Sequence, residues 1–257
     1  MTPAGFTEEE ILREALLAPR TALLPQPDTR ILEQDGLWRV ITPSLSQGGL
    51  NEVCGTRLEG ADADRVIDET LADYARHGIR FRWTLTPWDR PLDLAERLAR
   101  RGLTRDEACV MYRVLADAPL AAPAGVEPVD AANLDDYSRV FAEGFGVDPG
   151  PLAPMHRRTL LDEGRGRYLG FLASHQGVPG GAAAVLLLPR SAYLVGSAVS
   201  PGLRGKGLYR LLVHARERAA QQAGRRLVTT LARAETSAPI LERLGYATAA
   251  RVGIFRR

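Results

Sequence analysis

The feature that most constrains the fold is a glycine-rich stretch that joins an apolar run to an amphipathic one. Residues 192–199 form the apolar run, which has the length and composition of a buried strand. After it, apolar residues recur at spacings of three and four, which places them on one face of a helix: Leu208, Leu211, Leu212, Ala215 and Ala219. The chain between the two runs therefore turns from a strand directly into a helix.

The start of this helix is a favourable place for an anion. Its first backbone N–H groups lack partners within the helix and lie at the positive end of the helix dipole. Gly205 and Gly207 carry no side chain, so a phosphate can approach the backbone closely. Arg204, Lys206 and Arg210 add positive charge at the same place. The stretch predicts a site for a pyrophosphate group.

The spacing selects among pyrophosphate-binding loops. A P-loop needs Ser or Thr after its lysine, but Gly207 follows Lys206, and the dinucleotide pattern needs glycine where Arg210 stands. The pattern R-x-x-G-x-[G/A] fits, with Arg204 first, Gly207 fourth and Tyr209 sixth. This loop resembles the acetyl-CoA loop of the GNAT N-acetyltransferase superfamily. Tyr209 departs from the usual small residue, yet the run R-G-K-G-L-Y-R is similar to the R-G-x-G-A-Y-R variant of that family.

Composition excludes several other classes. The chain has 257 residues, enough for one large domain or two modest ones. A net charge of +2 gives no case for a nucleic-acid or membrane partner. Cys54 and Cys109 match no metal or redox spacing, so we expect no metal and a reducing, cytoplasmic setting. We find no apolar run as long as a membrane span and no signal peptide pattern.

The order of elements after residue 125 extends the resemblance. Residues 119–125, rich in Ala and Pro, are expected to be a linker. Over 126–257 the patterns predict strand, helix, helix, three strands, helix, strand, helix, strand. This order is similar to the GNAT fold, an α/β fold with a mixed central sheet flanked by helices. The segment 241–246, L-E-R-L-G-Y, resembles the family's Y-x-x-x-G-F/Y stretch at the end of the last helix.

The first 118 residues contain a weak echo of the second half. Thr7 and the glutamates after it predict a capped helix at the start. Farther on, residues 96–103 echo 242–246, and a strand follows each glycine. We interpret residues 1–118 as a helix followed by a partial, degenerate GNAT-like unit, although short helix–strand units also resemble one another by chance.

This first unit is not expected to bind CoA. Where the anion loop would fall, the sequence has Glu59, Asp62 and Asp64, whose charges would repel a pyrophosphate. We expect the first unit to pack against the second or to shape the site of the acceptor.

The resemblance implies a donor, acetyl-CoA, and a set of binding residues. Ser197, Ala198 and Val199 would pair with the pantetheine arm, and one of their N–H groups would face the thioester carbonyl. The pyrophosphate would be held by the loop and the first turn of the helix, that is by Arg204, Gly205, Lys206, Gly207, Leu208, Tyr209 and Arg210.

The general acid of the family has no counterpart here. Its tyrosine on the last helix corresponds to Leu241, and an asparagine seven residues earlier corresponds to Ala234. Either another group protonates the CoA thiolate or the thiolate leaves unaided. Tyr193 and Ser237 are the candidate substitutes, with an aromatic core or rim position as the alternative for Tyr193.

A base must take a proton from the amine, often a carboxylate acting through water. Glu143 and Asp148 border the expected acceptor site and are the candidates, with a solvated surface role as the alternative for each. His156, His175 and His214 have no partner at metal-ligand spacing and are expected at the surface.

The sequence thus predicts an acetyl-CoA-dependent N-acetyltransferase that acts on a primary amine of a small molecule or peptide, as a monomer or homodimer. A non-catalytic CoA-binding or regulatory module is the alternative, because the usual acid and asparagine are absent. Acyl groups other than acetyl are also compatible with the loop, and its composition names no acceptor.

Overall fold

The computed structural model describes residues 5–34 and 36–257 and divides into two compact units. Unit 1 holds the residues up to Leu24, Val110–Ala232 and Thr236–Ala250. Unit 2 holds Pro25–Cys109, Arg233–Glu235 and Arg251–Arg257. We expected a single boundary at residues 119–125, and the division is different. The residues up to Leu24 belong to unit 1 together with most of the second half of the chain, and Arg251–Arg257 belong to unit 2 together with most of the first half.

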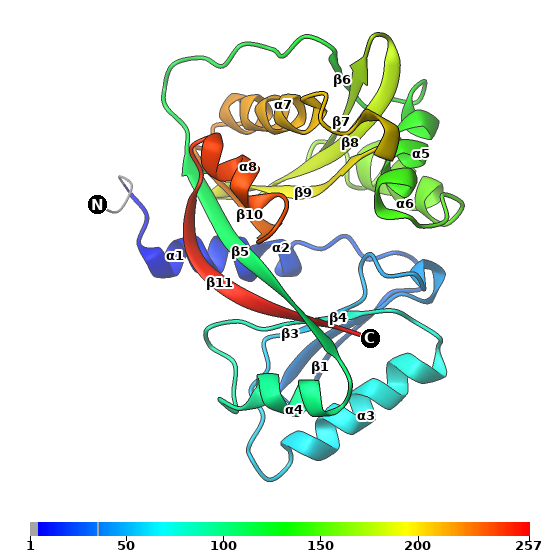
Figure 1. Cartoon of the computed structure of the whole chain (residues 1–257), viewed down its shortest axis with the longest axis vertical. Helices are drawn as coiled ribbons and strands as arrows, with labels where there is room; N and C mark the ends of the chain where they lie inside the picture. The colour runs from blue at the N-terminus through cyan, green and yellow to red at the C-terminus, as the bar shows by residue number, and fades with distance from the viewer. Residues whose placement is uncertain (1–4, 35) are drawn as a thin grey trace. The chain divides into compact units, whose positions relative to one another are not determined.

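Unit 1 is built on a mixed sheet whose strands lie in the order β5, β10, β9, β8, β7, β6 (Figure 1). Neighbours from β6 to β9 pair antiparallel, whereas β9 and β10 pair parallel. The strands are β5 (Thr104–Val114), which enters unit 1 at Val110, β6 (Val126–Pro128), β7 (Tyr168–His175), β8 (Val178–Leu187), β9 (Ser191–Val199) and β10 (Leu227–Arg233).

Helices cover both faces of this sheet. Ala182 and Ala184 pack with α5 (Leu134–Phe145) and α6 (Leu152–Leu160), whereas Ala183 between them packs with α7 (Leu208–Gln222). Alternate residues of a strand point to opposite faces, so α5 and α7 lie on opposite sides of the sheet. A short helix, α8 (Ala238–Arg243), follows β10. The predicted α/β class, a mixed sheet flanked by helices, is confirmed.

The N-terminal helix α1 (Glu8–Leu16) belongs to unit 1. The predicted capping box is present, with Thr7 and Glu10 each accepting from the other's backbone N–H. Glu10 also pairs with Arg190 at 2.8 Å, a contact across most of the chain length that local patterns do not encode. After α1 the chain forms a second short helix, α2 (Ala18–Thr21), with Pro19 in its first turn, where proline is tolerated.

In unit 2 the strands lie in the order β1, β2, β3, β4, β11, and the core is centred on the fully buried Trp83. The last residues of the chain complete it, since Phe255 of β11 pairs with Trp83 of β4. The elements are β1 (Arg30–Gln34), β2 (Leu37–Ile41), β3 (Glu52–Cys54), α3 (Ala63–Arg76), β4 (Arg82–Thr84), α4 (Leu94–Arg100) and β11 (Ala247–Arg256).

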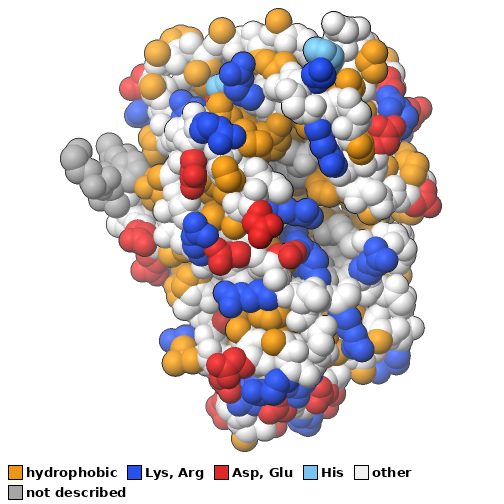
Figure 2. All heavy atoms as spheres, viewed as in Figure 1, with side chains coloured by type: hydrophobic (Ala, Val, Ile, Leu, Met, Phe, Trp, Pro, Cys, Tyr) orange, Lys and Arg blue, Asp and Glu red, His pale blue; other side chains and the backbone are white. Residues whose placement is uncertain are grey.

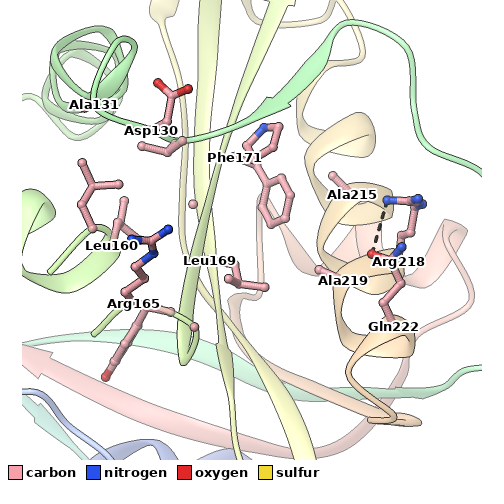
Figure 3. Close-up of a pocket in the computed structure, with 16 residues that line it drawn as sticks. Asp130, Ala131, Leu160, Arg165, Leu169, Phe171, Ala215, Arg218, Ala219 and Gln222 are labelled. Atoms are coloured by element: carbon pink, nitrogen blue, oxygen red, sulfur yellow. Dashed lines mark hydrogen bonds between the residues drawn. The ribbon is translucent and has the colours of Figure 1, made fainter. Parts of the chain in front are cut away.

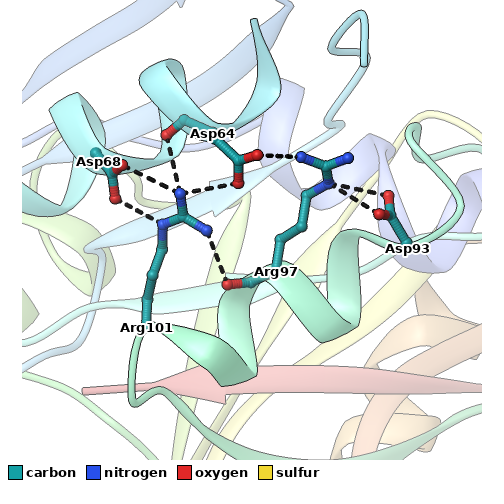
Figure 4. A network of polar contacts seen from close by, with 5 residues as sticks. All are labelled: Asp64, Asp68, Asp93, Arg97 and Arg101. Atoms are coloured by element: carbon teal, nitrogen blue, oxygen red, sulfur yellow. Dashed lines mark hydrogen bonds and ion pairs between the residues drawn. The ribbon is translucent and has the colours of Figure 1, made fainter. Parts of the chain in front are cut away.

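Ion pairs join the two helices of unit 2. Arg97 and Arg101 at the end of α4 both reach Asp64 on α3, and Arg101 also pairs with Asp68 at 2.6 Å (Figure 4). Asp93 holds Arg97 from its other side at 3.0 Å. Figure 2 accordingly shows acidic and basic side chains gathered together over α3 and α4. Asp64, whose charge was expected to repel a phosphate, thus forms ion pairs with two arginines.

In unit 2, the Asp89 side chain connects the two segments that follow β3 and β4. Its buried carboxylate accepts from the backbone N–H of Thr56 at 3.0 Å and of Thr86 at 2.8 Å, and from the Thr86 hydroxyl at 2.7 Å. Thr56 also accepts from the Trp83 indole at 2.9 Å, and its carbonyl accepts from the Arg90 N–H at 2.8 Å. The segments that leave β3 and β4 therefore stay connected to each other.

No helix in the described ranges is both long and apolar enough to cross a lipid bilayer.

Asp89→Ala should lower the free energy of unfolding by about 2–4 kcal/mol, because two buried N–H donors would lose their acceptor. Urea denaturation followed by tryptophan fluorescence measures this loss. Asp68→Ala is the matched control, since that side chain is 62% exposed and its ion pair with Arg101 should contribute less than about 1 kcal/mol. Equal losses in both variants would contradict the assigned role of Asp89.

Candidate functional site

The glycine-rich loop of unit 1 has the conformation that the sequence predicts. After β9 the chain makes one turn of 3-10 helix, η2 (Pro201–Leu203), and α7 begins at Leu208. Gly205 and Gly207 both have left-handed backbones, with φ of 78° and 82°, which explains glycine at both places. The space beside each is open, since a Cβ there would have no atom within 4 Å.

The loop carries exposed positive charge and backbone donors without a side-chain cap. Arg204, Lys206 and Arg210 are exposed, and Arg204 makes one long contact, of 3.4 Å, to the Gly144 carbonyl. Among the described residues no side chain caps the start of α7. The helix therefore presents its first N–H groups and its positive dipole end to the open space beside the loop.

The strands β9 and β10 part from each other close to this loop. Their ladder contains three pairs, and the last joins Tyr193 to Thr229. The Thr230 hydroxyl then donates to the Leu194 carbonyl at 3.2 Å, and beyond it no β10 residue pairs with β9 in the described structure. The other edge of β9 remains paired with β8 as far as Val199. One edge of residues 195–199 is thus available to a ligand.

A bulge in β9 lies at the centre of the parted stretch. The β8 ladder steps from Ser197 to Val195, so Gly196 is the extra residue. Gly196 has φ of 33°, and a Cβ there would lie 2.9 Å from the Phe141 ring. Only glycine fits this position without displacing the ring. The sequence analysis missed Gly196, although an isolated glycine inside an apolar strand is a recognised sign of a bulge.

The predicted donor-binding residues fall in two neighbouring groups. Ser197, Ala198 and Val199 lie on the parted stretch of β9. The remaining ones form the loop and the first turn of α7, where Leu208 is buried, Tyr209 is half-buried and the others are exposed. The structure thus brings together the two groups that the sequence placed on either side of one turn.

Glu143 is held at the end of α5. Its carboxylate accepts from the Ser200 hydroxyl at 2.6 Å and pairs with Arg139 at 2.9 Å. These two hydrogen bonds, that from Ser200 being the stronger influence, lower the pKa of Glu143. A carboxylate with a lowered pKa is a weaker base, so these contacts favour a role in tying α5 to the end of β9.

Tyr193 and Ser237 lie on different elements of unit 1. Tyr193 occupies the last paired position of β9 and packs, half-buried, beside the apolar cluster under α5. Ser237 directly precedes α8 and is half-buried, and its hydroxyl does not cap that helix. Asp148, the other predicted base, accepts from the Gly150 N–H in the loop after α5.

An aromatic row on α5 with a buried histidine was not predicted. Tyr137, Phe141 and Phe145 follow one another along the helix, and Phe145 is 44% exposed. His156 of α6 lies edge-on to the rings of Tyr137 and Phe141, with centroids 4.9 Å away in each case. Because Phe141 also reaches Gly196, this row lines the α5 side of the bulge.

The expectation that His156 is a surface residue is wrong. Its side chain is only 4% exposed, and Nδ1 lies 2.9 Å from the Ser138 hydroxyl. Burial lowers its pKa from 6.5 to about 4, so the ring is neutral at pH 7. Its position three to four residues from apolar neighbours on a short helix is the signal that could have indicated burial.

A separate pocket of about 570 Å³ opens at the β6–β7 edge of the sheet. Figure 3 shows Leu169 and Phe171 of β7 between α7, which contributes Ala215 and Ala219, and the opposite side, where Leu160 and Arg165 lie. It lies along the second half of α7, away from the glycine loop at its start. No predicted site residue lines this pocket.

The described residues contain no group of three or more His, Cys, Asp or Glu side chains arranged to hold a metal ion.

In unit 1 a strand thus parts from its neighbour beside a basic glycine loop at the start of a helix. Residues 130–246 match the model of the family described as Acetyltransferase (GNAT) family, and this domain belongs to that family. A search of curated proteins finds no match.

Solved structures resemble nearly the whole chain in fold. A GCN5-related N-acetyltransferase from Kribbella flavida has a TM-score of 0.65 at 16% identity, covering 99% of this chain and 96% of the other. A protein of unknown function from Staphylococcus epidermidis has a TM-score of 0.64 at 12% identity, covering 94% and 98%. A tandem GNAT protein of the clavulanic acid pathway has a TM-score of 0.51 at 18% identity, covering 92% and 85%.

The stability of the protein should fall by about 3 kcal/mol as pH drops from about 6.5 to 4, in addition to the contribution of the carboxylates. The pKa of His156 is 6.5 in the unfolded chain and about 4 in the folded protein. The stability that the neutral ring contributes is therefore fully present above pH 6.5 and is lost as the pH falls from 6.5 to 4. Urea unfolding at a series of pH values measures the slope.

His156→Phe keeps a ring in the cluster and removes the titration, so its slope through this range should be smaller by up to one proton. Identical slopes for the wild type and His156→Phe would contradict this account.

Proposed function

We propose that this protein is an acetyl-CoA-dependent N-acetyltransferase that transfers the acetyl group to a primary amine of a small molecule or peptide by direct attack. Membership of residues 130–246 in the GNAT family supports transfer of an acyl group from CoA. The observation that carries the proposal is the parting of β9 from β10 beside the glycine loop. A ligand bound there could pair with the free edge of β9 and accept hydrogen bonds from the N–H groups at the start of α7.

The loop would hold the diphosphate of CoA. The backbone N–H groups of residues 205–210 would donate to its oxygens, with Arg204, Lys206 and Arg210 as exposed counter-charges. The pantetheine arm would run along Ser197–Val199 and continue the sheet where β10 has left it. The thioester would then lie near the Gly196 bulge, which reorients the backbone N–H groups at that point.

The reaction needs a neutral amine, an oxyanion partner and a path for the thiolate. The amine nitrogen attacks the thioester carbon, the tetrahedral intermediate collapses, and the C–S bond breaks to give an amide, the CoA thiolate and a proton. Backbone N–H groups at the bulge are suited to the oxyanion. For the proton we keep Glu143 acting through water, and for the thiolate Tyr193 and Ser237, as candidate side chains.

Unit 2 would not bind a second CoA. Its counterpart of the loop contains Gly60, which does not adopt the left-handed backbone of Gly205 and Gly207. The strand ends that would have to part are connected through Asp89 and Thr56. A tandem arrangement with a single donor site is our interpretation of the chain.

A non-catalytic CoA-binding module is the second candidate, and one observation favours it. Leu241, where the family places a tyrosine, is a buried leucine on α8, and its side chain offers no proton. Incubating the protein with acetyl-CoA and a broad panel of amines, and measuring the free thiol released, distinguishes the enzyme from the binding module. Thiol release with any amine supports the enzyme, and CoA binding without release supports the module.

Gly207→Glu should weaken CoA binding by about 100-fold or more, because a carboxylate would occupy the place of the diphosphate; this corresponds to about 2.7 kcal/mol. Isothermal titration with CoA measures the affinity. Gly207→Ala controls for the strain of a side chain at φ 82°, and we expect a smaller loss. Gly60→Glu places the same charge in unit 2 and should leave the affinity unchanged. Unchanged affinity in Gly207→Glu would contradict the proposed loop.

Acetyl-CoA should slow hydrogen exchange within residues 192–240 and leave residues 55–65 unaffected, because the donor contacts the parted strand and loop of unit 1. Exchange followed by mass spectrometry, with and without acetyl-CoA, provides the comparison. Protection of residues 61–64 on addition of acetyl-CoA would show that unit 2 also holds a donor.

A further inference from the structure

Arg216 of α7 is a buried cation with an unused donor. Its side chain is 1% exposed. Nε donates to the Leu212 carbonyl at 2.9 Å, and Nη1 makes a long contact, of 3.4 Å, to the Ala184 carbonyl. Nη2 is buried and has no hydrogen-bond partner among the described residues. A guanidinium in this condition is costly, because neither its charge nor its donors are fully compensated.

The nearest carboxylate is already engaged elsewhere. Glu217, the next residue, is fully buried and pairs with Arg113 at 3.0 Å and with His214 at 3.3 Å. Within the described structure Arg216 forms no ion pair of its own. The other titratable groups close enough to influence its pKa are phenols, those of Tyr209 on α7, Tyr246 after α8 and Tyr137 on α5. Burial lowers the pKa of Arg216, but a guanidinium stays protonated in proteins.

The position of this cation relates it to the proposed site. Ala184, which its Nη1 contacts, is the β8 residue at which the ladder to β9 shifts around the Gly196 bulge. Arg216 reaches this point from the α7 side, whereas Phe141 reaches Gly196 from the α5 side. The charge therefore lies on the α7 side of the sheet, at the level of the bulge in β9.

We propose that the Arg216 guanidinium stabilises the negative charge on the CoA sulfur as the C–S bond breaks. The inference rests on the proposed acetyl transfer. In that step the electron pair of the C–S bond moves to sulfur, the carbonyl reforms on the amide, and the amine proton leaves to the base. A fixed positive charge in a buried, low-dielectric place lowers the energy of the thiolate without donating a proton to it.

This role explains how the site functions without the usual acid. Leu241 and Ala234 stand where the family places a tyrosine and an asparagine, and neither can donate to sulfur through its side chain. A thiol ionises near pH 8.5 in water, so a nearby cation is sufficient to make the thiolate the stable form at neutral pH.

The test measures the pH at which the thiol of enzyme-bound CoA ionises, from the ultraviolet absorbance of the thiolate. In the wild type the bound thiol should ionise about 1–3 pH units below free CoA. Arg216→Gln should raise this pKa to that of free CoA or above it, and Arg216→Lys should restore part of the shift. Arg218→Gln, two residues along α7 and half-buried, is the matched control and should keep the wild-type value.

Turnover gives a second readout. Arg216→Gln should lower kcat while the Kd for desulfo-CoA stays within about 3-fold, because the charge acts on the sulfur and the loop holds the rest of the cofactor. If Arg216→Gln does not fold, the wild type alone decides by comparison of bound with free CoA. A bound thiol that ionises at the same pH as free CoA overturns the inference and leaves the proposed function standing. Absence of CoA binding in the wild type overturns both.

Discussion

The structure of unit 1 depends on the loss of pairing between β9 and β10 after three residues. A strand edge left without partners inside a protein is costly, so native structures keep such an edge only where something else pairs with it. Here the other edge of β9 stays bonded to β8, and the bulge at Gly196 is fixed from both faces, by Phe141 on the α5 side and by Arg216 at the Ala184 carbonyl. The parting is therefore supported by packing, which is what a preformed site for an extended ligand requires.

Unit 2 provides a contrast to this arrangement. There the parallel strands β3 and β4 are also short, but the chain beyond them stays connected. Asp89 accepts from the backbone of both segments, and Trp83 donates to Thr56 beneath them. The polar groups that a ligand would satisfy are satisfied by the protein. Asp64, which lies near the position that corresponds to the glycine loop, forms ion pairs with Arg97 and Arg101.

Local features of the fold and site could be predicted from the sequence, and non-local ones could not. The loop glycines, the capping box at Thr7 and the helix stop at Gly245 depend on a few neighbouring residues, and the structure contains each of them. The membership of the first helix in unit 1 depends on contacts such as Glu10 with Arg190, which no periodicity reveals. His156 and Arg216 are polar residues on amphipathic helices, where exposure is the usual outcome, and only the packing of a second element shows that they are buried.

Two departures from the family pattern become coherent in the structure. Tyr209 is large where a small residue is usual, and Leu241 is apolar where a proton donor is usual. Burial raises the pKa of Tyr209, and the charge of Arg216 opposes that effect, which places the phenol next to the guanidinium. A large ring at the start of α7 helps to exclude water from the cation behind it, and a cation without water around it interacts more strongly with a developing anion. A site arranged in this way replaces proton donation from α8 by a fixed charge from α7, so the two departures are parts of one electrostatic arrangement.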